Sequence, residues 1–220
     1  MADLDKQAIA GMLPQEICEF LGEVPAFRGI QIFKWVASGA DSFDKMHNLS
    51  KKMREQLKGI FTLKSLSISQ ELHDPDGTIK LQLSLKDKKN IEAVLLTDSS
   101  GRKTACVSCQ AGCAMGCAFC QTGKLGFGRN LESAEIVEQF FLLEKIAGKL
   151  DNIVFMGMGE PMMNLDAIRK TVLVLTHPEG RALSSRRITI STSGIIKGIY
   201  DLADNGPHIC CVPYHSRCAT

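Results

Sequence analysis

The alternation of hydrophobic and polar positions divides the chain into three stretches with different periods. In the first stretch apolar residues recur at helical spacing, as at Ile30, Phe33 and Val36, and Ser50 is placed to cap a further helix. After this stretch the hydrophobic period changes to two, which is the period of strands. We therefore expect a small helical module over residues 1–60, followed by β-structure.

Strict alternation is clearest from Ile79 to Leu85, a stretch that lies between two turn signals rich in Asp, Asn, Lys and Gly. Ile91 to Leu96 then forms the second strand of a hairpin, and Glu92 lies inside it. Successive side chains of a strand point to opposite faces, so this carboxylate is committed to one face of the hairpin. We assign residues 61–98 to a β-hairpin extension.

Beyond residue 98, short apolar runs and longer amphipathic segments alternate. The expected elements are, in order, a strand over Ala105 to Ser108, a helix near Ser133 to Gly148, a strand over Ile153 to Met158, a helix over Asn164 to Leu175, a strand over Ile188 to Thr192, a helix over Ile195 to Ala203 and a strand over Ile209 to Val212. This alternation builds parallel sheets and barrels. The sequence therefore predicts an α/β fold, with three βα units and a fourth strand within residues 99–220.

Composition places the chain among globular proteins, since 45% of its residues are hydrophobic and 23% are charged. A net charge of +2 is too small to indicate nucleic-acid binding by itself. The apolar runs are far shorter than the roughly 20 residues that span a bilayer, and the N-terminus lacks the features of a secretory signal. We therefore expect no membrane contact and a cytoplasmic location, where the nine cysteines stay reduced and serve metal binding or thiol chemistry.

Five cysteines are concentrated in one loop, at positions 106, 109, 113, 117 and 120. Cys113, Cys117 and Cys120 have the spacing C-x3-C-x2-C, which holds three irons of a [4Fe-4S] cluster and leaves the fourth iron open to another ligand. Cys106 and Cys109 form, with Cys117 and Cys120, two C-x2-C pairs that suit tetrahedral zinc. The spacing alone leaves both metal sites open.

The residues around the cysteines carry a longer signature. The stretch from Cys106 to Leu131 contains CVSCQAGCAMGCAFCQTGKLGFGRNL, with Phe119 between the last two cysteines of the C-x3-C-x2-C motif. It resembles the signature region of the radical S-adenosylmethionine RNA methyltransferases of the RlmN and Cfr type. The resemblance continues through MGMGEP, which ends at Pro161, and through RRITISTSG, which ends at Gly194, and it covers about residues 15–209.

The resemblance implies a fold and two cofactors. It implies a partial (βα)6 radical SAM barrel that is preceded by the helical module and the hairpin. It implies a [4Fe-4S] cluster on three cysteines and S-adenosylmethionine on the open iron. The expected metal ligands are Cys113, Cys117 and Cys120, and the expected contacts to S-adenosylmethionine are Gly159, Glu160 and Ser191.

The resemblance also implies a reaction, the methylation of carbon 2 of adenine through a methyl-cysteine intermediate. Glu92 matches the family's proton-accepting carboxylate and Cys106 its resolving thiol. The implied partners are ribosomal RNA, transfer RNA and an external electron donor. RNA contact is assigned to the helical module over residues 1–60 and to basic residues that flank the cluster, with further candidates beyond them. The flanking residues are Arg102, Lys103, Lys124 and Arg129, and the further candidates are Arg181, Arg186 and Arg187.

The resemblance ends near Cys210. Cys210, Cys211 and Cys218 lie around the fourth strand and do not match the cysteine that receives the methyl group. We therefore expect a C-terminally truncated member of the family, which does not complete the reaction alone. The alternative hypothesis is a non-catalytic RNA-binding module with a structural zinc or iron–sulfur site.

Overall fold

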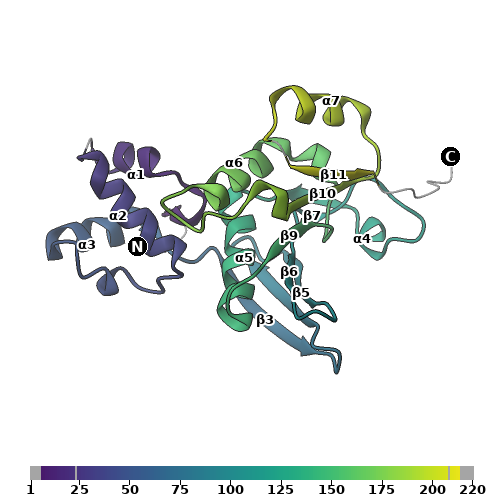
Figure 1. Cartoon of the computed structure of the whole chain (residues 1–220), viewed down its shortest axis with the longest axis horizontal. Helices are drawn as coiled ribbons and strands as arrows, with labels where there is room; N and C mark the ends of the chain where they lie inside the picture. Colours follow the sequence, from purple (N-terminus) through teal and green to yellow (C-terminus); the bar gives the residue numbers. More distant parts are fainter. Residues whose placement is uncertain (1–5, 23, 208, 214–220) are drawn as a thin grey trace.

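The computed structural model describes residues 6–22, 24–207 and 209–213 of the chain. Its centre is a seven-stranded sheet with the strand order β11-β10-β9-β6-β5-β4-β3 (Figure 1). These strands are β3 (Leu66–His73), β4 (Ile79–Leu85), β5 (Asn90–Thr97), β6 (Lys103–Cys106), β9 (Asn152–Phe155), β10 (Ile188–Thr192) and β11 (Cys210–Pro213). Helices lie between the later strands, which confirms the predicted α/β class.

The N-terminal helices gather at one end of the molecule (Figure 1). They are η2 (Ile9–Gly11), α1 (Pro14–Phe20), α2 (Ala26–Ala37), η3 (Phe43–Lys45) and α3 (Lys51–Ile60). Ser50 caps α3 as predicted, because its hydroxyl accepts a hydrogen bond of 3.2 Å from the backbone N–H of Met53. The module is closed by a short parallel pair, in which β1 (Gln7–Ala8) lies beside β2 (Phe61–Thr62).

The sheet is mixed, with an antiparallel half and a parallel half. Strands β3, β4, β5 and β6 pair antiparallel, whereas β6, β9, β10 and β11 pair parallel. The predicted hairpin is present as β4 and β5, and it continues directly into the α/β sheet because Val94 of β5 pairs with Cys106 of β6. The hairpin and the strand that leads into the cysteine loop therefore belong to one sheet.

The two faces of the sheet differ in polarity. One face carries fully buried apolar residues, which pack against α5 (Ser133–Ala147) and, behind it, α6 (Leu165–Thr176). The buried residues of this face include Leu81, Leu83, Ile91, Ala93, Ala105, Ile153, Ile188 and Ile190. The opposite face is half-exposed along every central strand, and its residues include Lys80, Gln82, Glu92, Val94, Thr104, Cys106, Asn152, Val154 and Thr189. We call this second surface the open face.

A buried carboxylate fixes the place where the chain leaves the helical module and enters the sheet. Glu138 of α5 is 7% exposed, and its carboxylate accepts hydrogen bonds from the backbone N–H of Ser65 at 2.8 Å, from the Ser65 hydroxyl at 2.6 Å and from the N–H of Leu66 at 3.1 Å. Burial raises the pKa of Glu138 to about 7, against the opposing effect of these donors. Glu138 thus holds the start of β3 against α5.

The strand that follows α5 ends earlier than the sequence predicts. The strand expected over Ile153 to Met158 is β9, which ends at Phe155 because the chain then turns across the end of β6. There the N–H of Gly157 donates to the carbonyl of Val107 at 3.1 Å, and a Cβ on Gly157 would lie 2.8 Å from that same oxygen.

Within the described residues, no helix is long and apolar enough to cross a membrane.

Candidate cluster and cofactor site

The cysteine loop is built as a short hairpin between β6 and α5. Its strands are β7 (Gln110–Gly112) and β8 (Phe127–Asn130), and α4 (Gln121–Lys124) lies between them. Gly112 has a φ of 83°, and a Cβ there would lie 2.0 Å from the carbonyl oxygen of Gly126. Only glycine permits this close approach, which lets the N–H of Cys113 donate to Gly126 at 2.9 Å.

The three predicted cluster cysteines lie at the closed end of this hairpin. Cys113 is 8% exposed, while Cys117 and Cys120 are half-buried, and the N–H of Cys120 donates to the carbonyl of Cys117 at 3.0 Å. Burial, and to a lesser extent the neighbouring Cys120, raises the pKa of the Cys113 thiol. Since metals bind thiolates, loading the site would displace protons from these thiols.

Among the residues that the structure describes, no three His, Cys, Asp or Glu side chains converge on a point suited to one metal ion. A tetrahedral zinc ion needs such convergence, whereas each iron of a cluster takes its own thiolate. Cys109 is 2% exposed, beneath the loop. The cluster on Cys113, Cys117 and Cys120 and the zinc site of two C-x2-C pairs both stay predictions from the cysteine spacing.

The turn after β9 lies directly against the root of the cysteine loop. The carbonyl of Met158 accepts a hydrogen bond of 2.8 Å from the N–H of Cys109, and Gly159 has a φ of 106°. Glu160 is 4% exposed. Its carboxylate accepts from the N–H of Met162 at 3.0 Å, the hydroxyl of Thr192 at 2.6 Å and the N–H of Ser193 at 2.8 Å. The Glu160 side chain thus ties this turn to the end of β10.

Ser191, the third residue predicted to contact S-adenosylmethionine, precedes Thr192 on β10 and is 9% exposed. Side-chain alternation places it on the same face as Thr189, which is the open face. Gly159, Glu160 and Ser191 are therefore brought together at the carboxyl ends of β9 and β10. In parallel α/β sheets, ligands bind at this end of the strands.

Glu92 and Cys106 both belong to the open face. Glu92 lies two residues from Val94, which is the strand partner of Cys106. The Glu92 carboxylate forms an ion pair of 2.7 Å with Lys80, and its side chain is 46% exposed. Burial raises the pKa of the Cys106 thiol, so this thiol is protonated at neutral pH.

Several buried polar side chains around the loop escaped the sequence analysis. Gln139 of α5 accepts from the N–H of Ser108 at 2.8 Å and donates to the carbonyl of Ser108 at 3.0 Å. Asn164 donates to the carbonyls of Cys109 and Leu131 at 2.8 and 2.9 Å. These amides form hydrogen bonds with backbone groups of the loop that have no hydrogen-bond partner in the main sheet. Their only sequence signal is a polar residue among apolar ones.

Two arginines assigned to RNA contact are engaged within the chain. Arg129 donates to both carboxylate oxygens of Glu135 at 2.8 Å and to Asp87 at 2.7 Å. Arg181 donates to Glu144 at 2.7 Å and to the carbonyl of Leu150 at 2.6 Å. These guanidinium groups hold the cysteine loop and α5 in place, and their assignment to RNA contact stays a prediction.

Replacing Arg129 by glutamine should destabilise the chain by about 2 kcal/mol, because Glu135 is buried and would lose its charged partner. The pKa of Asp87, which Arg129 lowers to about 2, should return toward 3.8. Urea unfolding and NMR titration would measure the two effects. Arg102→Gln is the matched control, since its partner Asp98 is exposed, and it should change stability little.

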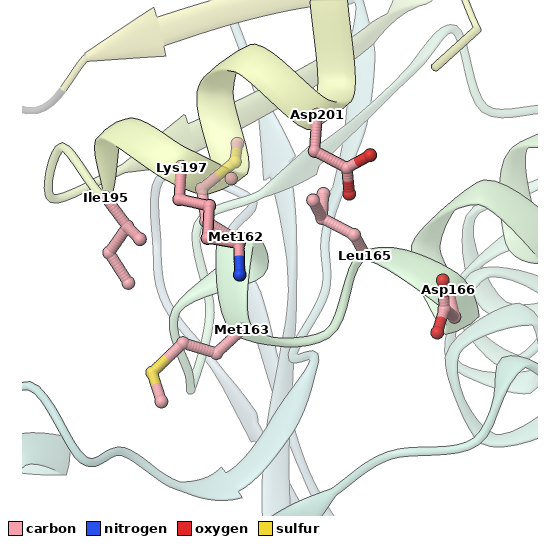
Figure 2. A pocket seen from close by; sticks show the side chains of 8 residues that line it. Met162, Met163, Leu165, Asp166, Ile195, Lys197 and Asp201 are labelled. Atoms are coloured by element: carbon pink, nitrogen blue, oxygen red, sulfur yellow. The ribbon is translucent and has the colours of Figure 1, made fainter. Parts of the chain in front are cut away.

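A groove of about 310 Å³ flanks the turn after β9 on the side of α7 (Ile196–Asn205), as Figure 2 shows. Met162 and Met163, which follow Glu160, form one wall with Leu165, and the side chains of Lys197 and Asp201 lie on the other. Because a Cβ on Gly198 would lie 2.6 Å from the Cβ of Met162, α7 rests directly on η4 (Pro161–Met163). Helix α7 thus packs against the residues that directly follow the turn after β9.

Comparisons with known proteins agree with this geometry. Residues 107–210 match the family model of the radical SAM superfamily, and residues 2–63 match that of the ribosomal RNA large subunit methyltransferase N-terminal domain. A crystal structure of a radical SAM methyltransferase from Sphaerobacter thermophilus superimposes with a TM-score of 0.88 at 39% identity, covering 94% of this chain and 63% of that one.

Among curated proteins, the probable dual-specificity RNA methyltransferase RlmN of Treponema denticola is 61% identical over 204 residues, covering 93% of this chain and 59% of the relative. The protein of the same description from Treponema pallidum strain Nichols is 54% identical over 197 residues, covering 90% and 58%. The chain therefore spans somewhat more than half the length of these relatives.

The match to the superfamily model and the structural match place the chain in the radical SAM class of proteins, and the three-cysteine loop beside a glycine turn agrees with that class. Within that class, the N-terminal helical module and the identity to both Treponema proteins decide the family. The chain belongs to the RlmN family.

Proposed function

We propose that this chain supplies the cluster-binding and cofactor-binding part of a radical SAM methyltransferase that acts on carbon 2 of adenine in ribosomal and transfer RNA. Both Treponema relatives are described as probable dual-specificity RNA methyltransferases. One structural observation carries the proposal. The loop of Cys113, Cys117 and Cys120 is hydrogen-bonded at its root to the turn that contains Gly159 and Glu160.

Each residue of the site has a role in this proposal. Cys113, Cys117 and Cys120 would hold the [4Fe-4S] cluster, which, when bound, supplies the electron that starts radical chemistry on S-adenosylmethionine. The turn at Gly159 and Glu160 would place the amino-acid end of that cofactor, with Glu160 acting mainly by fixing the turn. Ser191 would contact the cofactor from β10. An external electron donor would reduce the cluster.

The open face would receive the adenine. Glu92, which Lys80 orients, would accept the proton that leaves the ring, since a carboxylate about half-exposed on this face is within reach of solvent and substrate. Cys106 would act as the resolving thiol that releases the methylated RNA. Because burial raises its pKa, this thiol must lose its proton to a base before it attacks.

The first experiment is anaerobic reconstitution of the chain with iron and sulfide, followed by electron paramagnetic resonance of the reduced protein. We expect a [4Fe-4S] signal whose shape changes when S-adenosylmethionine is added, because the cofactor binds the iron that has no cysteine. Stoichiometric zinc with no retained iron would contradict the proposal and favour a non-catalytic RNA-binding module. A cluster signal that does not change when S-adenosylmethionine is added would contradict the proposed binding of S-adenosylmethionine to this chain.

A further inference from the structure

Gln110 is a fully buried amide whose side chain joins two parts of the site that lie far apart in the sequence. It begins β7, three residues before Cys113, and it is 0% exposed. Its Oε1 accepts a hydrogen bond of 2.9 Å from the backbone N–H of Glu160. Its Nε2 donates to Oδ1 of Asn130 at 2.8 Å, across the β7–β8 pair.

The backbone of the same residue makes a second link to the same turn. The N–H groups of Cys109 and Gln110 both donate to the carbonyl of Met158, at 2.8 and 3.1 Å. Gly159 then passes so close to the glutamine that an added Cβ would lie 2.6 Å from the Cβ of Gln110. The positive φ of Gly159 and the position of Gln110 therefore depend on each other.

The chemistry of these contacts requires an amide at position 110. One end of the side chain must accept from a backbone N–H, and the other end must donate to Asn130. Methionine has nearly the same length but would leave the buried N–H of Glu160 without an acceptor, which carries the full desolvation cost of that group. Asn130 is itself exposed and donates to the carbonyl of Met163 at 3.0 Å, so its orientation is fixed from the other side.

We propose that Gln110 is a positioning residue that couples the cysteine loop to the Gly159–Glu160 turn, so that filling the cluster site orders the place where S-adenosylmethionine binds. This inference rests on the proposed function for its ligands, while the coupling itself is a property of the chain. The Glu160 carboxylate is held by Met162, Thr192 and Ser193, and its backbone N–H is held by Gln110. A displacement of the loop therefore reaches the backbone N–H of Glu160 through the Gln110 side chain, whereas the backbone N–H groups of Cys109 and Gln110 reach only the carbonyl of Met158.

The test compares Gln110→Met with Gln139→Met in the full chain. Gln139 is a matched control because it is also a glutamine, is also 0% exposed and also forms a pair of hydrogen bonds to the same loop. These bonds go to the backbone of Ser108, and only the Ser108 hydroxyl, which Gln139 does not bind, reaches the turn. Hydrogen–deuterium exchange of the segment 156–163 is measured with and without the reconstituted cluster. Loading the cluster should slow this exchange in the unaltered chain and in Gln139→Met, and should not slow it in Gln110→Met.

Titration of the reduced, cluster-loaded proteins with S-adenosylmethionine, followed by electron paramagnetic resonance, gives the second readout. Gln110→Met should weaken binding by about tenfold, as the loss of one hydrogen bond to a buried N–H predicts, and Gln139→Met by much less. Equal exchange and equal affinity in both variants would overturn the inference. If the unaltered chain holds the cluster but ignores S-adenosylmethionine, the proposed function fails, and the exchange data alone still decide the coupling.

Asn130→Ala keeps the test decisive if Gln110→Met does not fold. Position 130 is exposed, so this variant keeps the core, while Nε2 of Gln110 loses its anchor and the amide is free to rotate. The cluster-dependent slowing of exchange should be reduced at residues 156–160, which exclude Met163, because the carbonyl of Met163 loses its own hydrogen bond from Asn130 in this variant. Full retention of that slowing in Asn130→Ala would contradict a coupling that runs through the Gln110 amide.

Discussion

Serine at Cys113, Cys117 or Cys120 should abolish iron retention by the reconstituted chain, whereas serine at Cys106 or Cys109 should leave the full iron content. The reason is that the first three thiols lie at the closed end of the loop hairpin, whereas Cys109 is buried beneath it. A hydroxyl is a much poorer ligand for iron than a thiolate. Iron and sulfide content per chain after gel filtration measures the effect.

Two of these variants separate the cluster from a zinc site. The paired C-x2-C arrangement uses Cys106 and Cys109 with Cys117 and Cys120, so it makes Cys109 essential and Cys113 dispensable. The cluster arrangement makes the opposite demand. Loss of metal in Cys109→Ser together with retention in Cys113→Ser would therefore refute the cluster assignment, while circular dichroism of each metal-free variant controls for misfolding.

Glutamine at Glu138 should remove a pH dependence of stability that the unaltered chain shows. The pKa of Glu138 is about 7 in the folded state, against 4.5 for an ordinary glutamate. Between these values the folded chain binds more protons than the unfolded chain, so its free energy of unfolding falls as the pH rises and levels off above the folded-state pKa. The shift in the pKa of Glu138 corresponds to a decrease of about 3 kcal/mol in the free energy of unfolding across this pH range. Urea unfolding at about pH 5 and about pH 8 measures it.

Glu138→Leu provides the contrasting variant. Leucine removes the acceptor of three hydrogen bonds from Ser65 and Leu66, so this variant should be destabilised at both pH values by about 2–4 kcal/mol. Like Glu138→Gln, it should show a flat dependence on pH in this window. A Glu138→Gln variant with the pH slope of the unaltered chain would assign that slope to another group.

The strands and helices of the α/β region followed closely from local pattern. The strand predicted over Ile188 to Thr192 coincides with β10, and the helix predicted near Ser133 to Gly148 is α5, one residue shorter. Ile79 to Leu85 is β4. In each case one uninterrupted hydrophobic period extends over the whole element, and a turn or a cap marks its end.

The same reasoning from local pattern does not predict long-range contacts. β1 and β2 are two residues each and pair across the whole helical module, so neither carries a local signal. Glu138 and Gln139 look like ordinary polar positions of a surface helix, but the loops that pack on α5 bury both. Polar residues become interior wherever their partners come from distant segments.

The residues of the site also fall into those that local pattern predicts and those that depend on distant contacts. Spacing alone identified the cysteines as candidate metal ligands, because ligands of one metal site often lie close together in the sequence. The engagement of Glu160 with Thr192 depends on a strand 32 residues further on, and its backbone contact with Gln110 on a loop 50 residues earlier. No local pattern encodes those partners. The roles of the cluster cysteines stay predictions that rest on spacing and on the family resemblance. Those of Gly159, Glu160, Ser191, Glu92 and Cys106 stay predictions that rest on the resemblance.

The unequal faces of the sheet give the chain two nearly independent sets of positions. The apolar face and its helices supply the burial that folds the chain, whereas the open face, from Lys80 through Cys106 to Thr189, contributes little to that burial. Substitutions on the open face should therefore cost little stability. Under the proposed function, in which this face receives the adenine, its positions other than Glu92, Cys106 and Ser191 are those at which substrate recognition could change without loss of the fold.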